Sequence, residues 1–228
     1  MLLDVQTITN TWKTTALKRG LIHPIDEKPL AKSTARFPEG RVPEPWFGNP
    51  NLASIFVLTL NPGHGGSDHN HNVATKSFFW SMMGCNASYS DYVSSVSKDG
   101  LLWGERNYGA FLKYSMSQIC NLRLVAYPSP NKASMGNISD APADVLPTAK
   151  LMCDFVHRSL VPAARRGRCL LLVMRSPRDW GFGNPEIDIW DNGLFISRSL
   201  RTVSITPTSR VGTTIADWLE GFNVEALR

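Results

Sequence analysis

No apolar run of the chain is nearly as long as a membrane-spanning helix, which needs about 20 residues. Its first residues also lack the charged-then-apolar pattern of a secretory signal. Closely spaced cysteine pairs, which disulfide frameworks, zinc sites and iron–sulfur sites favour, are missing as well. These absences favour a cytoplasmic protein with no membrane partner, whose four cysteines are reduced core residues: Cys85, Cys120, Cys153 and Cys169.

A strong excess of charge of one sign is also missing. The 24 Lys and Arg residues outnumber the 19 Asp and Glu residues by five, which permits a polyanionic partner without requiring one. With 228 residues, 43% of them hydrophobic, the chain is long enough for one sizeable core. We therefore expect a single domain over residues 1–228, with an N-terminal helix and a Pro-rich lead-in over 1–45 and an α/β core over 46–228.

Four segments have strand character and are apolar almost throughout, as strands buried on both faces are. They span residues 54–60, 122–127, 169–174 and 202–206. Helix candidates alternate with them, at residues 5–18, 76–84, 105–119, 144–164 and 211–222. This alternation predicts a three-layer α/β/α domain with a central, mainly parallel four-stranded sheet.

A polar or proline-bearing loop follows each of these four strands. The loops read NPGHGG, YPSPNKAS, RSPRDWGFGN and TPTSR in chain order. Ligands of parallel sheets bind beyond the carboxyl ends of the strands. We therefore expect the four loops to converge on one functional edge of the sheet.

The first loop and the helix candidate after it resemble the uracil-DNA glycosylase superfamily, in particular its mismatch-specific branch. The strand ends in LNPGH, which matches the Asn-Pro-Gly motif of that branch. The resemblance gives Asn61 the catalytic, water-positioning role and places Pro62 and Gly63 at the base. The SFFW segment resembles the aromatic pair that stacks on a flipped base, which makes Phe79 the expected stacking residue and Phe78 the reserve.

The last loop, ITPTSR, takes the place of the family's His-Pro-Ser or Asn-Pro-Ser motif, which contacts the base carbonyl and enters the minor groove. Thr206 then has the second catalytic position, although the family has histidine or asparagine there. The expected DNA contacts are His64, Arg175, Arg178, Pro207, Thr208, Ser209 and Arg210, and the candidates for an apolar wedge are Trp180, Phe182 and Val211. Residues 179–200 have no counterpart in the family and are treated as an insertion.

The chemistry that the resemblance implies is limited by the amide at position 61. An asparagine side chain does not titrate, so Asn61 can orient a water but cannot act as a general base. This suffices where the glycosidic bond breaks early, and it implies a slow enzyme. Because the family's histidine is missing, the departing base needs another donor, for which Asn121, Arg175 and Arg210 are candidates. Asn121 is also assigned to base binding.

Gly63 stands where uracil-specific relatives carry a tyrosine that walls off the C5 edge of the base. A glycine implies a roomier pocket. The resemblance therefore implies a monofunctional DNA glycosylase that leaves an abasic site, acting on a bulky 5-substituted cytosine such as the glucosylated hydroxymethylcytosine of phage DNA. Excision of mismatched uracil or thymine in repair is the alternative. The expected enzyme binds duplex DNA with a flipped base, needs no cofactor and is a monomer.

Two rival functions remain open at this stage. The HGGSDHNH segment could hold zinc or iron in a metal-dependent hydrolase, with His64, Asp68, His69 and His71 as ligands, although its spacing matches no firm motif. A catalytically inactive protein that only binds nucleic acid is the other rival. The preferred interpretation includes no metal.

Overall fold

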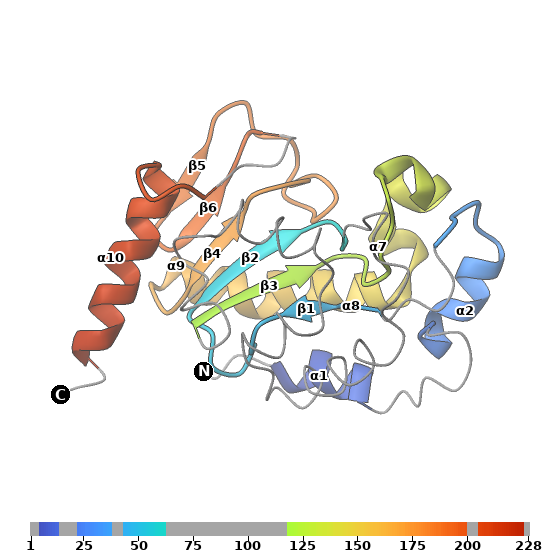
Figure 1. Ribbon diagram of the computed structural model, residues 1–228, viewed down its shortest axis with the longest axis horizontal. Helices are drawn as coiled ribbons and strands as arrows, with labels where there is room; N and C mark the ends of the chain where they lie inside the picture. Colours follow the sequence, from blue (N-terminus) through green and yellow to red (C-terminus); the bar gives the residue numbers. More distant parts are fainter. Residues whose placement is uncertain (1–4, 14–21, 38–42, 63–117, 200–204, 226–228) are drawn as a thin grey trace.

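The computed structural model describes residues 5–13, 22–37, 43–62, 118–199 and 205–225 (Figure 1). Its helices and strands are, in chain order, α1 (Val5–Lys13), α2 (Pro24–Ala31), β1 (Trp46–Phe47), β2 (Ile55–Thr59), β3 (Ile119–Arg123), the 3-10 helix η3 (Lys132–Asp140), α7 (Pro142–Val145), α8 (Pro147–Phe155), the π-helix η4 (Val156–Leu160), α9 (Val161–Arg165), β4 (Leu170–Val173), β5 (Ile189–Asp191), β6 (Leu194–Ile196) and α10 (Arg210–Glu225).

The described strands form one six-stranded sheet in the order β1-β3-β2-β4-β6-β5. The four inner strands are parallel, whereas β1 and β5 are antiparallel additions at the two edges. The predicted α/β class with a mainly parallel centre is confirmed, but the predicted number of four strands is wrong. The edge strands have two and three residues, too few for a period-two pattern, so pairing with β3 and β6 decides their conformation.

Two of the four predicted strands lie within their expected bounds, because β2 falls inside 54–60 and β4 inside 169–174. The second prediction is displaced, since β3 begins at Ile119 and ends at Arg123. The fourth is wrong where it can be checked: Ile205 and Thr206 are not in a strand, and 202–204 lie outside the described residues. The fourth parallel strand is β6, inside the segment taken as an insertion, and it pairs with Leu171–Val173 of β4.

Helices cover both faces of this sheet. On one face α1 and α8 contribute Ile8, Met152 and Phe155 to a core that includes Phe56 and Leu58 of β2. On the other face α10 packs Val211, Ile215 and Leu219 against Ile55 and Val57. Neighbouring residues of β2 thus alternate between two cores, which explains why its sequence is apolar throughout.

Three predicted helices are observed, as α1, as the run from α7 to α9, and as α10. The helix α2 was not predicted, because its eight residues contain Pro24 and Pro29. The prediction for 76–84 lies outside the described residues, and of 105–119 only Gln118 and Ile119 are described. Within the described part of the chain, no helix combines the length and the apolar character that a membrane crossing requires.

Candidate functional site

The carboxyl ends of β2 and β4 mark the point where the order of the parallel strands reverses. The chain places β3 on one side of β2 and then places β4 on the other side. Figure 1 shows the arrowheads of β2, β3 and β4 pointing the same way. In open α/β sheets, ligands bind outside the strands at such a reversal. The first residues beyond it are Leu60 and Asn61 after β2, and Met174 and Arg175 after β4.

Asn61 is half-buried, and its carboxamide is fixed by two hydrogen bonds. Nδ2 donates to the Ser129 Oγ at 2.7 Å and to the Pro62 carbonyl oxygen at 2.9 Å. The Asn61 Oδ1 accepts no hydrogen bond from the described part of the chain. The amide oxygen is the atom that can accept a proton from a water, so the geometry suits a water-orienting role.

Ser129 belongs to the YPSPNKAS loop, which follows β3. It is buried, its N–H donates to the Pro62 carbonyl at 3.1 Å, and its hydroxyl donates to the Asn131 carbonyl at 3.1 Å. The loops after β2 and β3 are therefore joined through backbone and side chain. The sequence prediction included this loop but did not identify Ser129 as a partner of Asn61.

The loops after β3 and β4 are joined as well. Ser176 has a φ of 54°, an uncommon left-handed conformation for a residue other than glycine, and its carbonyl accepts from the Asp179 N–H at 3.0 Å. The nearly buried Asp179 carboxylate binds the Lys132 ammonium at 3.4 Å. Since β3 and β4 flank β2 in the sheet, this ion pair connects the two loops on either side of the strand that ends at Asn61.

Asn121 lies deeper in the sheet than its predicted base-binding role suggests. It is in β3 beside Val57, so at roughly 3.3 Å per residue it is about 13 Å along the strands from the level of Asn61. Its Oδ1 accepts the Thr59 hydroxyl proton at 2.7 Å. Thr59 is the last residue of β2, and Asn61 follows it by two residues. Asn121 therefore bonds the last residue of β2 and lies well before the edge of the sheet.

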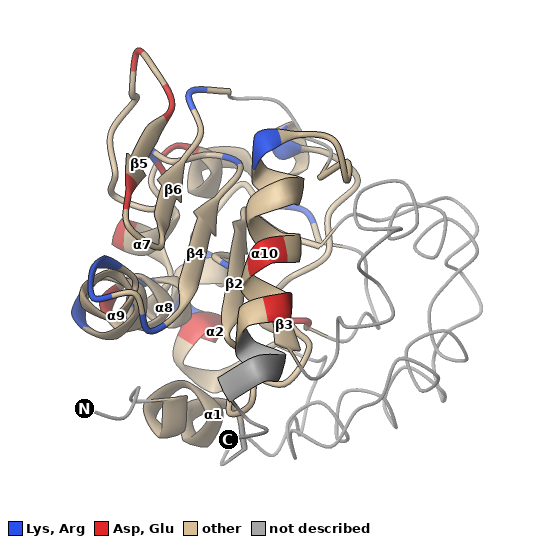
Figure 2. Cartoon of the chain, turned by 90° about the vertical axis from the view of Figure 1, so that its left-hand side faces the viewer, with Lys and Arg blue, Asp and Glu red and all other residues tan. Residues whose placement is uncertain are grey.

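Exposed arginines surround the carboxyl ends of the inner strands. Arg175 and Arg178 follow β4, and Arg198 follows β6. The Arg210 guanidinium lies 4.8 Å from the centre of the Trp190 ring, at the start of α10. Figure 2 shows basic segments in blue at the upper end of α10 and beside β6. Exposed arginines at the edge suit contacts to phosphate.

The ITPTSR segment forms a turn that starts α10. The Thr206 carbonyl accepts from the Ser209 N–H at 3.0 Å and from its hydroxyl at 2.7 Å, and the Ser209 Oγ accepts from the Gly212 N–H at 3.0 Å. Ser209 is thus the N-cap of the helix. A Cβ at Gly212 would come within 1.9 Å of the Thr206 oxygen, so only glycine fits there. The side chains of Thr206, Pro207 and Thr208 are exposed.

Several predicted residues do not reach this edge or cannot be placed. Trp180 and Val211 are buried in the two cores, which excludes them as exposed wedges in this conformation. Phe182 is half-buried and packs on the His157 ring, with centroids 4.7 Å apart.

The predictions for Gly63, His64, Phe78 and Phe79, and for the metal site at His64, Asp68, His69 and His71, lie outside the described residues. Among the residues that are described, no cluster of His, Cys, Asp or Glu suits a metal.

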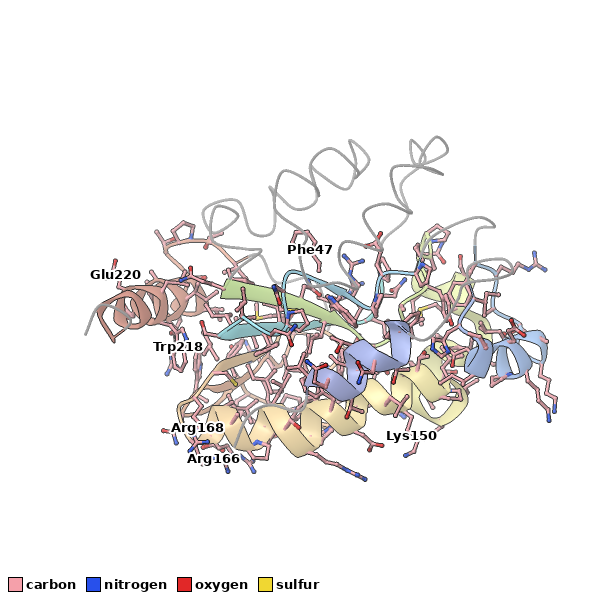
Figure 3. All side chains as sticks on the ribbon, turned by 90° about the horizontal axis from the view of Figure 1, so that it is seen from below. Phe47, Lys150, Arg166, Arg168, Trp218 and Glu220 are labelled. Atoms are coloured by element: carbon pink, nitrogen blue, oxygen red, sulfur yellow. The ribbon has the colours of Figure 1, made fainter. Side chains whose placement is uncertain are left out.

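A separate group of exposed arginines lies apart from the site. Arg165, Arg166 and Arg168 precede β4 and are exposed at its amino end. In Figure 3, Arg166 and Arg168 lie together at the end of the helical run that contains α8 and α9, on the opposite side of the sheet from Phe47. Arg165 is paired with Asp191 at 2.8 Å. These residues are therefore separated from the predicted DNA contacts.

The described cysteines take no part in the edge. Burial raises the pKa of the Cys169 thiol to about 12, and burial followed by the Asp154 charge raises that of Cys153 to about 12. Thiols with such pKa values stay protonated and weakly nucleophilic at neutral pH.

Comparison of the chain with known protein families, curated proteins and solved structures gives no match.

Proposed function

We propose that the protein is a monofunctional DNA glycosylase that hydrolyses the N-glycosidic bond of a modified pyrimidine. The observation that carries the proposal is the position and orientation of Asn61. Its carboxamide stands beyond the end of β2 at the reversal of strand order, with both N–H bonds used by the protein. A fixed amide whose oxygen accepts a hydrogen bond from none of the described residues is suited to hold a hydrolytic water.

In the proposed reaction the bond between C1′ of the deoxyribose and the base nitrogen breaks first. The base leaves with the bonding electrons, and the water held by Asn61 adds its oxygen to C1′, so the products are a free base and an abasic site. Asn61 only orients this water, because an amide cannot remove its proton. The proton is lost to solvent or to the departing base.

The departing base carries negative charge and needs a donor. Arg175 is the candidate that the fold favours, since it is exposed and lies two residues beyond the end of β4, the strand next to β2. Arg210 already stacks on Trp190, and Asn121 is tied to Thr59 inside the sheet. Thr206 takes the base-carbonyl position on the basis of the family resemblance.

The proposed substrate is a bulky 5-substituted cytosine in duplex DNA, with glucosylated hydroxymethylcytosine as the leading candidate and antiviral defence as the setting. Gly63 supports this proposal because no side chain at that position can wall off the C5 edge. Exposed Arg175, Arg178 and Arg210 supply positive charge for the DNA backbone. Flipping a base out of the duplex costs a few kcal/mol, which stacking on Phe79 or Phe78 would offset.

The test is a panel of duplex oligonucleotides that contain glucosylated hydroxymethylcytosine, hydroxymethylcytosine, uracil opposite guanine, or thymine opposite guanine. Released base is identified by mass spectrometry, and abasic sites by strand cleavage in alkali. We expect the wild-type protein to release the glucosylated base and Asn61→Ala to release none. The control is Asn51→Ala, which replaces an exposed asparagine before β2 and should excise normally. Near-normal excision by a folded Asn61→Ala variant would refute the proposed role.

The other outcomes identify the rival functions. Excision of uracil or thymine alone assigns the protein to mismatch repair. Activity that disappears after dialysis against a chelator and returns with zinc or iron assigns it to the metal-dependent hydrolases. Binding without any released base identifies an inactive nucleic-acid-binding protein. Trapping of the protein on DNA by borohydride would contradict a monofunctional mechanism, and Lys132 would be the first lysine to replace.

A further inference from the structure

The orientation of the Asn61 carboxamide follows from its partners. The Pro62 carbonyl oxygen has no proton to give, so the atom of Asn61 that faces it at 2.9 Å must be the nitrogen. Reversing the amide would set its oxygen against that carbonyl and remove the bond to the Ser129 Oγ as well. The two partners therefore select one of the two amide orientations.

The direction of the Ser129 hydroxyl is selected in turn by Asn131. A serine hydroxyl has one proton, and Ser129 gives it to the Asn131 carbonyl oxygen at 3.1 Å. The Ser129 oxygen can then only accept from Asn61. Without that carbonyl, the hydroxyl could donate to the amide oxygen and stabilise the reversed orientation.

Ser129 holds the motif at two points. In addition to the bond with the Asn61 side chain, its own N–H donates to the Pro62 carbonyl at 3.1 Å. It is 2% exposed, so water does not compete effectively for these bonds. The two side-chain hydrogen bonds therefore run in one direction, since Asn61 donates to Ser129 and Ser129 donates to Asn131.

We propose that Ser129 is a positioning residue for Asn61 and keeps its amide oxygen directed at the hydrolytic water; this proposal depends on the proposed glycosylase function. A reversed amide would present N–H groups to the water and could not accept a proton from it. Ser129 acts on the water through Asn61, which holds the water directly. Its contribution is to remove the unproductive orientation before the substrate binds.

The kinetic test measures single-turnover excision and DNA affinity separately. We expect Ser129→Ala to slow excision about tenfold to hundredfold, the cost of a misplaced catalytic group, with unchanged affinity for the DNA. Ser129→Thr keeps a hydroxyl and should recover most of the rate. Ser134→Ala is the matched control, since this hydroxyl belongs to the same loop and bonds the Asn131 Oδ1 at 3.0 Å without contacting Asn61. A normal rate in Ser129→Ala overturns the proposal.

A second measurement does not depend on activity. In nitrogen-15 NMR spectra, both side-chain amide protons of Asn61 should exchange slowly with solvent in the wild type and in Ser134→Ala. One of them should exchange fast in Ser129→Ala. Unaltered exchange in Ser129→Ala overturns the positioning role, even if excision slows. If the wild type shows the expected exchange pattern but excises no base of the panel, the proposed function is wrong. The orientation of the Asn61 amide by Ser129 would then still hold.

Discussion

The carboxylate of Asp26, in the first turn of α2, binds the amino end of α8 through Thr148. Its Oδ1 accepts the Thr148 N–H at 3.1 Å, and its Oδ2 accepts the Thr148 hydroxyl proton. The Tyr127 hydroxyl donates to the same Oδ2 at 2.7 Å, and Asp26 is fully buried. One carboxylate therefore joins the N-terminal lead-in, the loop after β3 and helix α8. Tyr127 precedes Ser129 by two residues, so this network also supports the loop that holds Asn61.

Asp26→Ala should lower the free energy of unfolding by about 3 kcal/mol, because it leaves buried donors on Tyr127 and Thr148 without an acceptor. Asp26→Asn keeps one acceptor oxygen and should cost less. Urea denaturation measures both, with the exposed Glu27→Ala as the control. Equal, small effects of Asp26→Ala and Glu27→Ala would contradict the role assigned to the buried carboxylate.

The buried Tyr127 should lower the free energy of unfolding at alkaline pH. Burial, followed by the Asp26 charge, raises the pKa of Tyr127 far above its ordinary value of 10.0. Above pH 10 the unfolded chain loses this proton while the folded protein keeps it, so the unfolded state gains stability. The free energy of unfolding should fall by at most about 1.4 kcal/mol per pH unit from this group.

The control for this pH dependence is Tyr127→Phe, which removes the ionising group. Its free energy of unfolding should be lower at pH 7, where it lacks the hydrogen bond to Asp26, and should decline less steeply above pH 10 than that of the wild type. Denaturation in urea from pH 8 to pH 11 gives both slopes. Parallel curves for the two proteins would assign the alkaline loss to other groups.

DNA binding should weaken steeply as salt increases, since contacts to phosphate release counterions. Arg178→Ala, at the proposed edge, should lower the slope of log affinity against log salt by about one. Arg166→Ala removes an exposed arginine from the opposite end of the strands and should leave the slope unchanged. Equal reductions in both variants would contradict the placement of the DNA, and a flat salt dependence would argue against a nucleic-acid ligand.

Gly63→Tyr should block excision of bulky 5-substituted pyrimidines far more than excision of uracil. A tyrosine would occupy the space that the substituent needs. Its cost to the excision of these bases should be larger than that of simple overpacking, which is about 1–3 kcal/mol. Rates are compared on matched duplexes that differ only in the base. Gly63→Ala is the control for a backbone requirement at this position, which would harm both variants alike. Equal losses in the two variants on every base would refute the open-pocket argument.

The sequence by itself was sufficient for the parts of the fold that repeat a local pattern. Continuous apolar runs identified β2 and β4, because strands buried on both faces need no polar alternation. The helical run from α7 to α9 and the helix α10 followed from apolar periodicity. Position also made Asn61 a candidate, since an Asn-Pro pair after a buried strand lies at the carboxyl edge of a parallel sheet.

Only the tertiary structure decided which groups meet. The strand β6 was missed because its three residues acquire strand conformation by pairing with β4. Ser129 is 68 residues from Asn61 in the chain, and Tyr127 is 101 residues from Asp26. No local propensity encodes such pairs. They form because the order of the strands brings the loops to one edge, where most buried polar groups pair with whatever the fold places beside them.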